Sequence, residues 1–512
     1  MSDDTLYTFF KTYGNNILFK YRKNGKSYAK KIDFYKPSIY IRDNSGEIES
    51  IYGYKLKHKL FESIRDAREF TNSMKDMGNF TIEGNSNYAN QFLIELYQGQ
   101  MPKFDPKDIR VCILDIEVVA PVFPEPAEAE YPITAITFYD SYTDKYYVFC
   151  LKGYTHDKSH PLLGKLNVEF VHCTDELDLL NRMLRHFNEF QYDLVSGWNS
   201  ELFDMPYIVN RCYKLVGEKL TKKMLSPFEH IEMREIPNQY GKPKISATIT
   251  GLPHLDYMAL YVKHIHTPRE SYKLGFIANA EVETGKISYE EEGDLTGLYE
   301  TNPQKYVEYN INDVYLIKLL DDKLGLFNIT YTLAYYSLSN FEDTLGTTKL
   351  WEQLIAKHLY NKNQVPLFRR EHQEGREFDG AFVHPTVVGK HDWVVSFDLN
   401  SLYPMNEIQY NIGPETLIPV DELPDELRML KAKYNLDDLV HGRIDLSVLQ
   451  KYDVIMSGSF SFYRKDKVSF MAEIKDDLYT GRKTFKKQML KAQSNVQMLK
   501  AEARKRGLIK DV

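Results

Sequence analysis

Two carboxylates, Asp115 and Glu117, lie two residues apart in the otherwise apolar run Val111–Val119. Residues two apart on a β-strand point to the same face, so these side chains would lie next to each other. Burial and mutual repulsion of two such charges are unfavourable unless cations neutralise them. The pattern therefore predicts a site for hard cations such as Mg²⁺, which prefer oxygen ligands. The alternative is a strand end with both acids in water.

Two other segments carry residue types suited to the same chemistry. Tyr309 and Asp313 are four residues apart and would share a face of a helix. Asp204 precedes a helix that begins near Pro206, where an ordinary N-cap is the alternative interpretation. Together with the first pair, these acids match the needs of two-metal phosphodiester hydrolysis, in which two ions about 4 Å apart activate water and stabilise the reacting phosphate. Tyr309 would orient the attacking water.

The segments around these residues predict an α/β domain over residues 110–325. Near-continuous apolar runs are typical of sheets covered on both faces, and here they alternate with helical patterns. The predicted strands are Val111–Val119, Ala135–Tyr139 and Tyr146–Leu151, and the predicted helices are Glu176–Phe190 and Pro206–Val216. A hairpin is predicted around Gln239–Ile249.

The flanking regions have a different texture. Before the α/β domain, Tyr- and Ile-rich runs separated by Gly and Asn predict small antiparallel β structure with a helix near Phe61–Met77. After it, Asn328–His358 has a helical pattern, and Trp393–Pro404 predicts a strand followed by a turn. Met471–Arg506 is rich in helix formers and lacks proline, which predicts a long helix.

The composition is that of a folded protein with unevenly distributed charge. A length of 512 residues suggests about three domains. The net charge of −7 argues against coating of duplex DNA through bulk charge. However, Arg482–Val512 carries ten basic and two acidic residues, which indicates either a solvated helix face or a contact with phosphates.

Targeting and cysteine signals are weak. Four scattered cysteines predict neither a disulfide framework nor a zinc site and fit a reducing compartment. The acidic start differs from a signal peptide. The longest charge-free stretch, Leu324–Phe341, is interrupted by Ser, Thr and Asn, so no membrane contact is expected.

The three acidic segments resemble a known set of motifs. In chain order, Asp115-Ile-Glu117, Asn199 through Asp204, and Tyr309 through Asp313 resemble the exonuclease motifs of DnaQ-like 3′→5′ exonucleases in family B DNA polymerases. The resemblance implies a ribonuclease H-like exonuclease domain with a proofreading role. It also implies that these four carboxylates hold the ions, Mg²⁺ with Mn²⁺ as a substitute, and that Tyr309 takes part in catalysis.

A second resemblance follows in the chain. Asp398-Leu-Asn-Ser-Leu-Tyr-Pro404 is similar to the first palm motif of the same family, with Met405 where a small polar residue is usual. The resemblance implies that Asp398 and the Leu399 carbonyl ligate metal. It further implies that Ser401, Leu402 and Tyr403 meet the incoming nucleotide, with the Tyr403 ring under the sugar to reject a 2′-hydroxyl.

The basic segment Arg482–Met489 resembles the fingers helix of the polymerases of T4-type bacteriophages. Arg482 and Lys486 are one helical turn apart, a geometry suited to the β- and γ-phosphates of a nucleotide. The matching order includes Glu377–Val383 and covers nearly the whole chain.

The resemblance implies an α/β and α+β multidomain protein. Its expected parts are an amino-terminal domain of mixed structure (1–109 and 326–370), an exonuclease domain (110–325), an incomplete palm (371–464) and the first half of the fingers (465–512).

Two motifs of the family's polymerase site, Lys-x3-Asn-Ser-x-Tyr-Gly and Asp-Thr-Asp, do not occur in this sequence. We therefore expect the amino-terminal subunit of a split replicative DNA-directed DNA polymerase, which needs a carboxy-terminal polypeptide for synthesis. Expected ligands are primer–template and single-stranded DNA and dNTPs, with a sliding clamp reached through the partner, in the cytoplasm of a phage-infected bacterium. A stand-alone 3′→5′ exonuclease and a non-catalytic nucleic-acid-binding module are the alternatives.

Two further expectations rest on similarity of position. Lys286 would contact the scissile phosphate, with an ordinary exposed loop lysine as the alternative. The hairpin near Tyr240–Ile249 would help to part primer from template.

Overall fold

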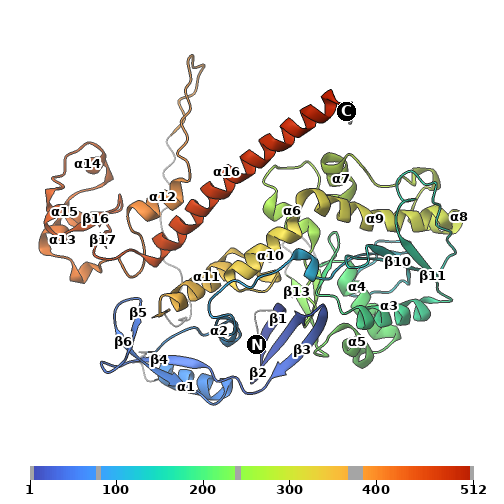
Figure 1. Cartoon of the computed structure of the whole chain (residues 1–512), viewed down its shortest axis with the longest axis horizontal. Helices are drawn as coiled ribbons and strands as arrows, with labels where there is room; N and C mark the ends of the chain where they lie inside the picture. Colours follow the sequence, from blue (N-terminus) through green and yellow to red (C-terminus); the bar gives the residue numbers. More distant parts are fainter. Residues whose placement is uncertain (1–4, 77–81, 237–243, 367–384, 508–512) are drawn as a thin grey trace. The chain divides into compact units, whose positions relative to one another are not determined.

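The computed structural model describes residues 5–76, 82–236, 244–366 and 385–507 (Figure 1). The chain forms two compact units. The first unit comprises Met1–Arg42 and Lys57–Asn361, and the second unit comprises Asp43–Leu56 and Lys362–Val512. The acidic segments predicted to bind cations lie in the first unit, and the segments predicted to bind a nucleotide lie in the second.

The first unit begins with small antiparallel β structure. Strands β1 (Leu6–Tyr13), β2 (Asn16–Lys23) and β3 (Lys26–Ile32) form a three-stranded sheet, and β4 (Ser38–Arg42) pairs with β7 (Ile82–Glu83). Two helices follow or interrupt these strands, α1 (Ile64–Asp76) and α2 (Tyr88–Leu96). The prediction of antiparallel strands with a helix near Phe61–Met77 is confirmed.

A five-stranded mixed sheet is the centre of the first unit. Its spatial order is β11-β10-β9-β8-β12. The strands are β8 (Val111–Val118), β9 (Ile133–Asp140), β10 (Lys145–Cys150), β11 (Val168–His172) and β12 (Leu194–Ser196). Strand β9 runs antiparallel to β8 and β10, whereas β12 is parallel to β8 and β11 is parallel to β10.

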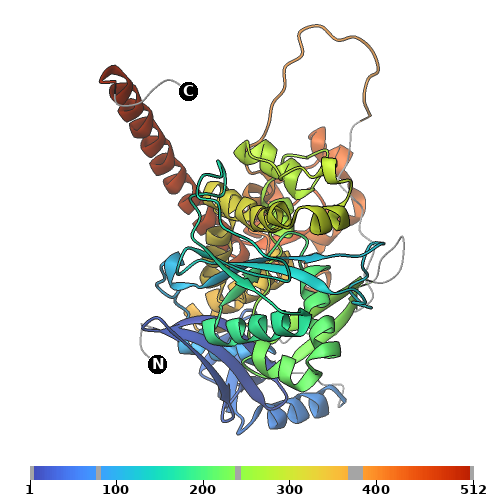
Figure 2. The ribbon, with the colours of Figure 1, turned by 90° about the vertical axis from the view of Figure 1, so that its right-hand side faces the viewer.

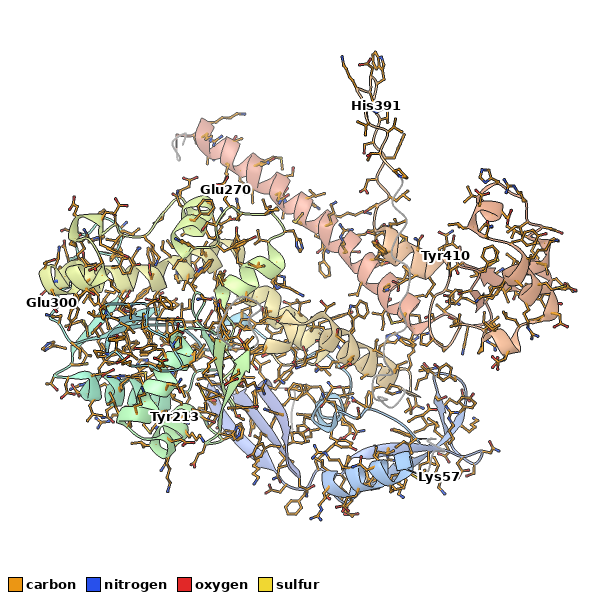
Figure 3. The ribbon with its side chains drawn as sticks, turned by 180° about the vertical axis from the view of Figure 1, so that it is seen from behind. Lys57, Tyr213, Glu270, Glu300, His391 and Tyr410 are labelled. Carbon is orange, nitrogen blue, oxygen red and sulfur yellow. The ribbon has the colours of Figure 1, made fainter. Side chains whose placement is uncertain are left out.

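Alternation along β8 sends its side chains to opposite faces of this sheet. Leu114 and Ile116 join the apolar core that is formed with α3 and α4, whereas Asp115 and Glu117 point to the face that α9 covers. The helices are α3 (Glu176–Phe190), α4 (Asp204–Leu215) and α9 (Pro303–Leu324). Figure 2 shows the strands between α9 on one side and the green helices α3 and α4 on the other. Tyr213 of α4 and Glu300 of α8 mark these two sides in Figure 3.

The other elements of the first unit surround this sheet. They are α5 (Glu218–Leu225), the hairpin β13 (Ile231–Ile236) and β14 (Lys244–Ile249), α6 (Tyr257–His264), α7 (Leu274–Val282), α8 (Leu295–Thr301), α10 (Leu326–Ser337) and α11 (Thr347–Asn361). The predicted hairpin exists, but its tip at residues 237–243 lies outside the described residues. The helical region predicted at Asn328–His358 is two helices, because the chain turns between Leu338 and Gly346.

The second unit is mainly helical. Its elements are α12 (Leu402–Gln409), α13 (Asp425–Lys433), α14 (Leu436–Val440), α15 (Ser447–Lys451), the hairpin β16 (Val454–Met456) and β17 (Phe462–Arg464), and α16 (Phe470–Lys505). In addition, β15 (Gln364–Val365) pairs with β5 (Ile48–Ser50), which pairs with the start of β6 (Lys55–Leu60). A small apolar core joins α13 to the β16–β17 hairpin. The long helix predicted at Met471–Arg506 is confirmed as α16.

The strand predicted at Trp393–Asp398 is wrong. Residues 385–400 form no helix or strand, and Figure 3 shows His391 at the far end of this extended loop. The side chains of Trp393 and Phe397 are 99% and 91% exposed. A strand needs neighbours to complete its ladder of hydrogen bonds, and no described strand pairs with this segment.

Two of the weaker signals can also be compared with the structure. All four cysteines are buried free thiols, so no disulfide forms among them. Within the described ranges, no helix has the length and apolar character needed to cross a membrane.

Candidate active site

Three carboxylates of the first unit converge where α9 crosses the edge of β8. Asp115 and Glu117 come from the strand and Asp313 from the helix. One oxygen from each lies within 4.8 Å of the others. Glu117 and Asp313 are buried, whereas Asp115 is partly exposed. The sequence predictions that Asp115 and Glu117 share a strand face and that Tyr309 and Asp313 share a helix are confirmed.

Burial and mutual repulsion make the charged forms of these carboxylates unfavourable. Burial, together with the charges of Glu117 and Asp313, raises the pKa of Asp115 well above its ordinary value. Burial and then the charge of Asp313 raise the pKa of Glu117 to about 8. Burial also raises the pKa of Asp313, although contact with Lys286 opposes this. Full ionisation of the cluster therefore requires additional positive charge nearby.

The donor set of the cluster fits a divalent cation. All three side chains offer carboxylate oxygens, which are the preferred ligands of hard cations. Oδ1 of Asp313 is buried and has no hydrogen-bond partner, so it retains an unused acceptor directed into the protein. In the described part of the chain, this is the one group of three or more such side chains close enough to share an ion.

Lys286 and Tyr309 border the cluster. The Lys286 ammonium donates to the Tyr309 hydroxyl at 2.9 Å and also contacts Oδ2 of Asp313. Burial and the charge of Asp313 raise the pKa of Tyr309, so its hydroxyl stays protonated. About one third of the Lys286 side chain is exposed. Lys286 is an exposed loop lysine, as the alternative interpretation has it, and it also contacts two of the predicted site residues.

Asp204 lies beside the cluster without being one of the three close carboxylates. It is the first residue of α4 and not the N-cap, which is Phe203. Its Oδ1 accepts a hydrogen bond at 3.1 Å from the backbone N–H of Ile116, the residue between Asp115 and Glu117. Burial raises the pKa of Asp204 to about 7. The N-cap interpretation is wrong, because this carboxylate is directed to β8 instead of to its own helix.

A β-bulge lies next to Glu117. The register between β8 and β9 shifts after Glu117, and Thr134 of β9 is passed over. The Thr134 hydroxyl donates to the Glu117 carbonyl at 3.0 Å and lies 2.6 Å from the Tyr306 hydroxyl of α9. Bulges are common beside active sites because they change the direction of a side chain. Here the bulge ties β8, β9 and α9 together at the cluster.

Two residues beside Asp115 were not identified from the sequence. Asn310 of α9 donates through Nδ2 to Oδ2 of Asp115 at 2.8 Å, and Thr137 of β9 contacts Asn310. The available signal is that asparagine is a poor helix former, yet Asn310 stands between Tyr309 and Asp313 in a long helix. A single threonine, Thr137, in an otherwise apolar strand is a weaker indication of a buried polar contact.

The second unit brings two of the predicted nucleotide-binding segments together. Helix α12 packs against α16, and the Glu407 carboxylate pairs with Lys475. Near this contact, Nη1 of Arg482 donates to the Ser401 hydroxyl at 3.5 Å. Arg482 and Lys486 are both exposed on α16, one turn apart. Residues about 80 positions apart in the sequence therefore meet at one place.

The remaining predicted nucleotide-binding residues are open to solvent. Leu399, Leu402 and Tyr403 are 69%, 42% and 75% exposed. Asp398 is also exposed and belongs to no group of metal-ligating side chains within the described residues. The second unit therefore presents the Asp398–Pro404 segment on its surface, not in an enclosed pocket.

Comparison with known proteins identifies the class to which these sites belong. Residues 70–277 match the family model for the exonuclease domain of DNA polymerase family B, and residues 344–507 match the model for DNA polymerase family B. The first model covers Asp115, Glu117 and Asp204, and the second covers the segments of the second unit that are predicted to bind a nucleotide, whereas Asp313 lies between the two matched ranges. The chain belongs to family B of the DNA polymerases.

Within this family, the chain is similar to phage proteins. It is 31% identical to a DNA-directed DNA polymerase of Escherichia phage RB69 over 511 residues, covering 95% of this chain and 54% of the relative. It is 32% identical to the DNA-directed DNA polymerase of Enterobacteria phage T4 over 430 residues, covering 80% of this chain and 47% of the relative. The catalytic subunit of DNA polymerase delta from Caenorhabditis elegans is 23% identical over 60% of this chain. The chain spans about half the length of the phage relatives.

Proposed function

We propose that the first unit is a 3′→5′ exonuclease of ribonuclease H-like fold that removes nucleotides from single-stranded DNA ends. The observation that carries the proposal is the convergence of Asp115, Glu117 and Asp313 within 4.8 Å. The strand order supports it, because β9 is antiparallel to its neighbours and β12 is parallel to β8. The family match over residues 70–277 adds the exonuclease class.

The chemistry follows from the donor set. Asp115, Glu117 and Asp313, with Asp204 beside them, would hold Mg²⁺ or Mn²⁺, which supply activation of water and stabilisation of charge on the phosphate. The protonated Tyr309 hydroxyl, held by Lys286, orients the attacking water. Lys286 remains partly exposed and attracts the phosphate of the terminal nucleotide.

The exonuclease proposal is tested by degradation of DNA that is labelled at one end. Cleavage should depend on Mg²⁺ or Mn²⁺ and should release nucleotides from the 3′ end of single-stranded DNA. Asp115→Ala combined with Glu117→Ala should abolish it. Persistence of activity in this double variant would show that another site cleaves the DNA. Degradation from the 5′ end would contradict the assigned polarity.

We further propose that the second unit supplies part of a DNA polymerase site. The contact between Arg482 and Ser401 supports this, because it joins the two segments that would hold the nucleotide. Asp398 and the Leu399 carbonyl would ligate metal, Leu402 and Tyr403 would meet the sugar and phosphates, and Arg482 and Lys486 would bind the β- and γ-phosphates.

DNA synthesis by this arrangement would require a carboxy-terminal polypeptide. The Asp-Thr-Asp and Lys-x3-Asn-Ser-x-Tyr-Gly motifs do not occur in the printed sequence, and one carboxylate is a poor holder of two cations. The partner would carry these motifs and the contact with a sliding clamp. The proposed parts are an amino-terminal domain (1–109 and 326–370), an exonuclease (110–325), a partial palm (371–464) and partial fingers (465–512), acting in the cytoplasm of an infected bacterium.

Primer extension tests the requirement for a partner. The chain alone should not extend a primed template with dNTPs. Addition of a polypeptide that carries the two absent motifs should produce extension, which depends on Asp398. Extension by the isolated chain would overturn the proposed division of the polymerase site.

A further inference from the structure

The Asp115 carboxylate is joined to the neighbouring strand and to α9 by buried polar side chains. Asp115 and Thr137 are direct partners in the register between β8 and β9, so their side chains lie on the same face of the sheet. Asn310 of α9 lies over both of them. Neither Asn310 nor Thr137 has any exposed surface.

The hydrogen bonds among these residues have a fixed direction. The Thr137 hydroxyl donates to Oδ1 of Asn310, and Nδ2 of Asn310 donates to Oδ2 of Asp115 at 2.8 Å. Nδ2 also lies 3.4 Å from the Asp115 carbonyl oxygen. The reversed amide would place its oxygen against the acceptors of Asp115. The Asp115 carboxylate, which can only accept, therefore selects this orientation of the amide, and the Thr137 hydroxyl stabilises it by donating to the amide oxygen.

These contacts have an energetic consequence for α9. Asparagine is a poor helix former, and a buried amide is unfavourable unless it is hydrogen-bonded. An apolar residue at position 310 would suit the helix and its packing against the sheet. The hydrogen bonds to Asp115 and Thr137 offset the burial of this amide, and Asn310 also bonds the Glu117 carboxylate, so the amide acts on the acidic cluster.

We propose that Asn310 and Thr137 are positioning residues for the cation site of the exonuclease. Asn310 occupies Oδ2 of Asp115 and leaves the other carboxylate oxygen for a cation, while Thr137 holds the Asn310 amide in the donating orientation. Hydrogen bonds of this kind orient metal ligands, and their loss typically weakens metal binding about 10- to 100-fold. The inference rests on the proposed exonuclease function of the cluster.

Binding of Mn²⁺ to the full chain, measured by calorimetry without DNA, provides a test that is independent of activity. Asn310→Leu keeps the approximate size of the side chain and should weaken Mn²⁺ binding about 10- to 100-fold. Thr137→Val should weaken it less, because the amide remains but loses its donor. Thr137→Ser restores the hydroxyl and should recover affinity.

A matched control separates positioning from general loss of a buried hydroxyl. Thr330 of α10 is also fully buried, and its hydroxyl donates to the Leu326 carbonyl at 3.0 Å. Thr330→Val should lower thermal stability about as much as Thr137→Val but should leave Mn²⁺ affinity unchanged. Equal losses of affinity in the two variants would overturn the inference.

The combined variants distinguish this inference from the function on which it rests. Unchanged Mn²⁺ binding in Asp115→Ala with Glu117→Ala would refute the cation site itself. If that variant loses binding while Asn310→Leu and Thr137→Val bind normally, the positioning role is refuted. The double variant Asn310→Leu with Thr137→Val should bind Mn²⁺ as tightly as Asn310→Leu alone, because both residues act through one chain of hydrogen bonds. Additive losses would contradict that chain. If Asn310→Leu fails to fold, Thr137→Val and Thr137→Ser still decide the outcome.

Discussion

The acidic cluster of the first unit is largely buried, whereas the segments of the second unit that we propose to bind a nucleotide are exposed. Glu117, Asp204 and Asp313 are 7%, 5% and 3% exposed and come from β8, α4 and α9. By contrast, Phe397 and Tyr403 are 91% and 75% exposed. The first site is assembled by neighbouring strands and a helix of one domain. In the second unit, no described element encloses the Asp398–Pro404 segment.

The difference shows what a local fold can supply. A carboxylate pair on a buried strand receives its environment from the adjacent strand and the covering helix, which the same domain provides. A segment with which no described strand pairs is left open to solvent. We therefore expect changes in the first unit to act on cleavage and on stability, and changes in the second unit to act only on synthesis with a partner.

The largest effect is expected at the acidic cluster. Asp115→Ala with Glu117→Ala removes two cation ligands and should lower the rate of single-turnover DNA cleavage about 10³-fold or more. Extension by the complex with a carboxy-terminal partner should stay within about twofold, because the synthesis residues lie in the other unit.

A matched control for that variant removes the same charge from the surface of the first unit. Glu290→Ala with Glu291→Ala changes two exposed acids and should leave cleavage unchanged. Equal loss of cleavage and synthesis in Asp115→Ala with Glu117→Ala would show that the two activities share one site. The distinction between the two units would then be wrong.

A large effect on stability is expected at the end of β9. Asp140 has no exposed side-chain surface and receives two hydrogen bonds from the Arg110 guanidinium at 2.7 and 2.8 Å. Asp140→Asn removes the anionic partner of this arginine, which keeps only its hydrogen bond to the Phe190 carbonyl, and should lower the free energy of unfolding by about 3 kcal/mol at pH 7. Urea unfolding of the first unit measures the change.

The same pair has a defined pH dependence. Although burial opposes it, the bonds from Arg110 and Thr143 hold the pKa of Asp140 below its usual value of 3.8. Because the folded-state pKa is the lower one, the stabilisation is present above about pH 4 and is lost as the pH falls through the folded-state pKa. The difference between wild type and Asp140→Asn should therefore shrink below pH 4. A constant difference down to pH 2 would contradict the ionic role.

A smaller effect is expected at the exposed phosphate-binding residues. Arg482→Ala or Lys486→Ala removes a charge-assisted contact and should lower kcat/KM for dNTP about 10- to 100-fold in primer extension with the partner. DNA cleavage should not change. Lys487→Ala is the control, because this lysine lies on another face of α16. Equal effects of Lys486→Ala and Lys487→Ala would indicate general attraction of charge instead of a specific grip.

The smallest effect is expected for a surface ion pair of the second unit. The Lys451 ammonium lies 2.6 Å from the Glu426 carboxylate, and both side chains are at least half exposed. Exposed pairs of this kind contribute little to stability. Glu426→Gln should leave the Tm of the second unit within about 2 °C of the wild-type value in calorimetry. A larger shift in Tm would contradict the expectation that this exposed ion pair contributes less to stability than the buried pair of Arg110 and Asp140.

The sequence predicts well those features that depend on local periodicity. The spacing of Asp115 and Glu117 places them on one face of β8, and the helix predicted at Glu176–Phe190 has the bounds of α3. The spacing of Tyr309 and Asp313 likewise places both on α9. In each case the apolar pattern of a few consecutive residues determines the element and the face.

The failures concern contacts between distant segments. Thr137 opposes Asp115 only because of the register of β8 and β9, and Asn310 reaches both only because α9 crosses them. Neither relation can be read from sequence spacing. The strand expected at Trp393–Asp398 has the right residue types, but strand formation also requires neighbouring strands. The contact of Asp204 with Ile116, which argues against the alternative of a helix cap, is equally remote in sequence.

The alternation of β8 has one more consequence. The residues that fill the core, Leu114 and Ile116, and the acids that would cut DNA, Asp115 and Glu117, are interleaved in a single strand. A slip of one position would turn the apolar set to the face under α9 and the acids into the apolar core at the same time. A copy with the wrong register would thus lose its apolar core and its acidic cluster together, so only a correctly folded domain would carry the complete site.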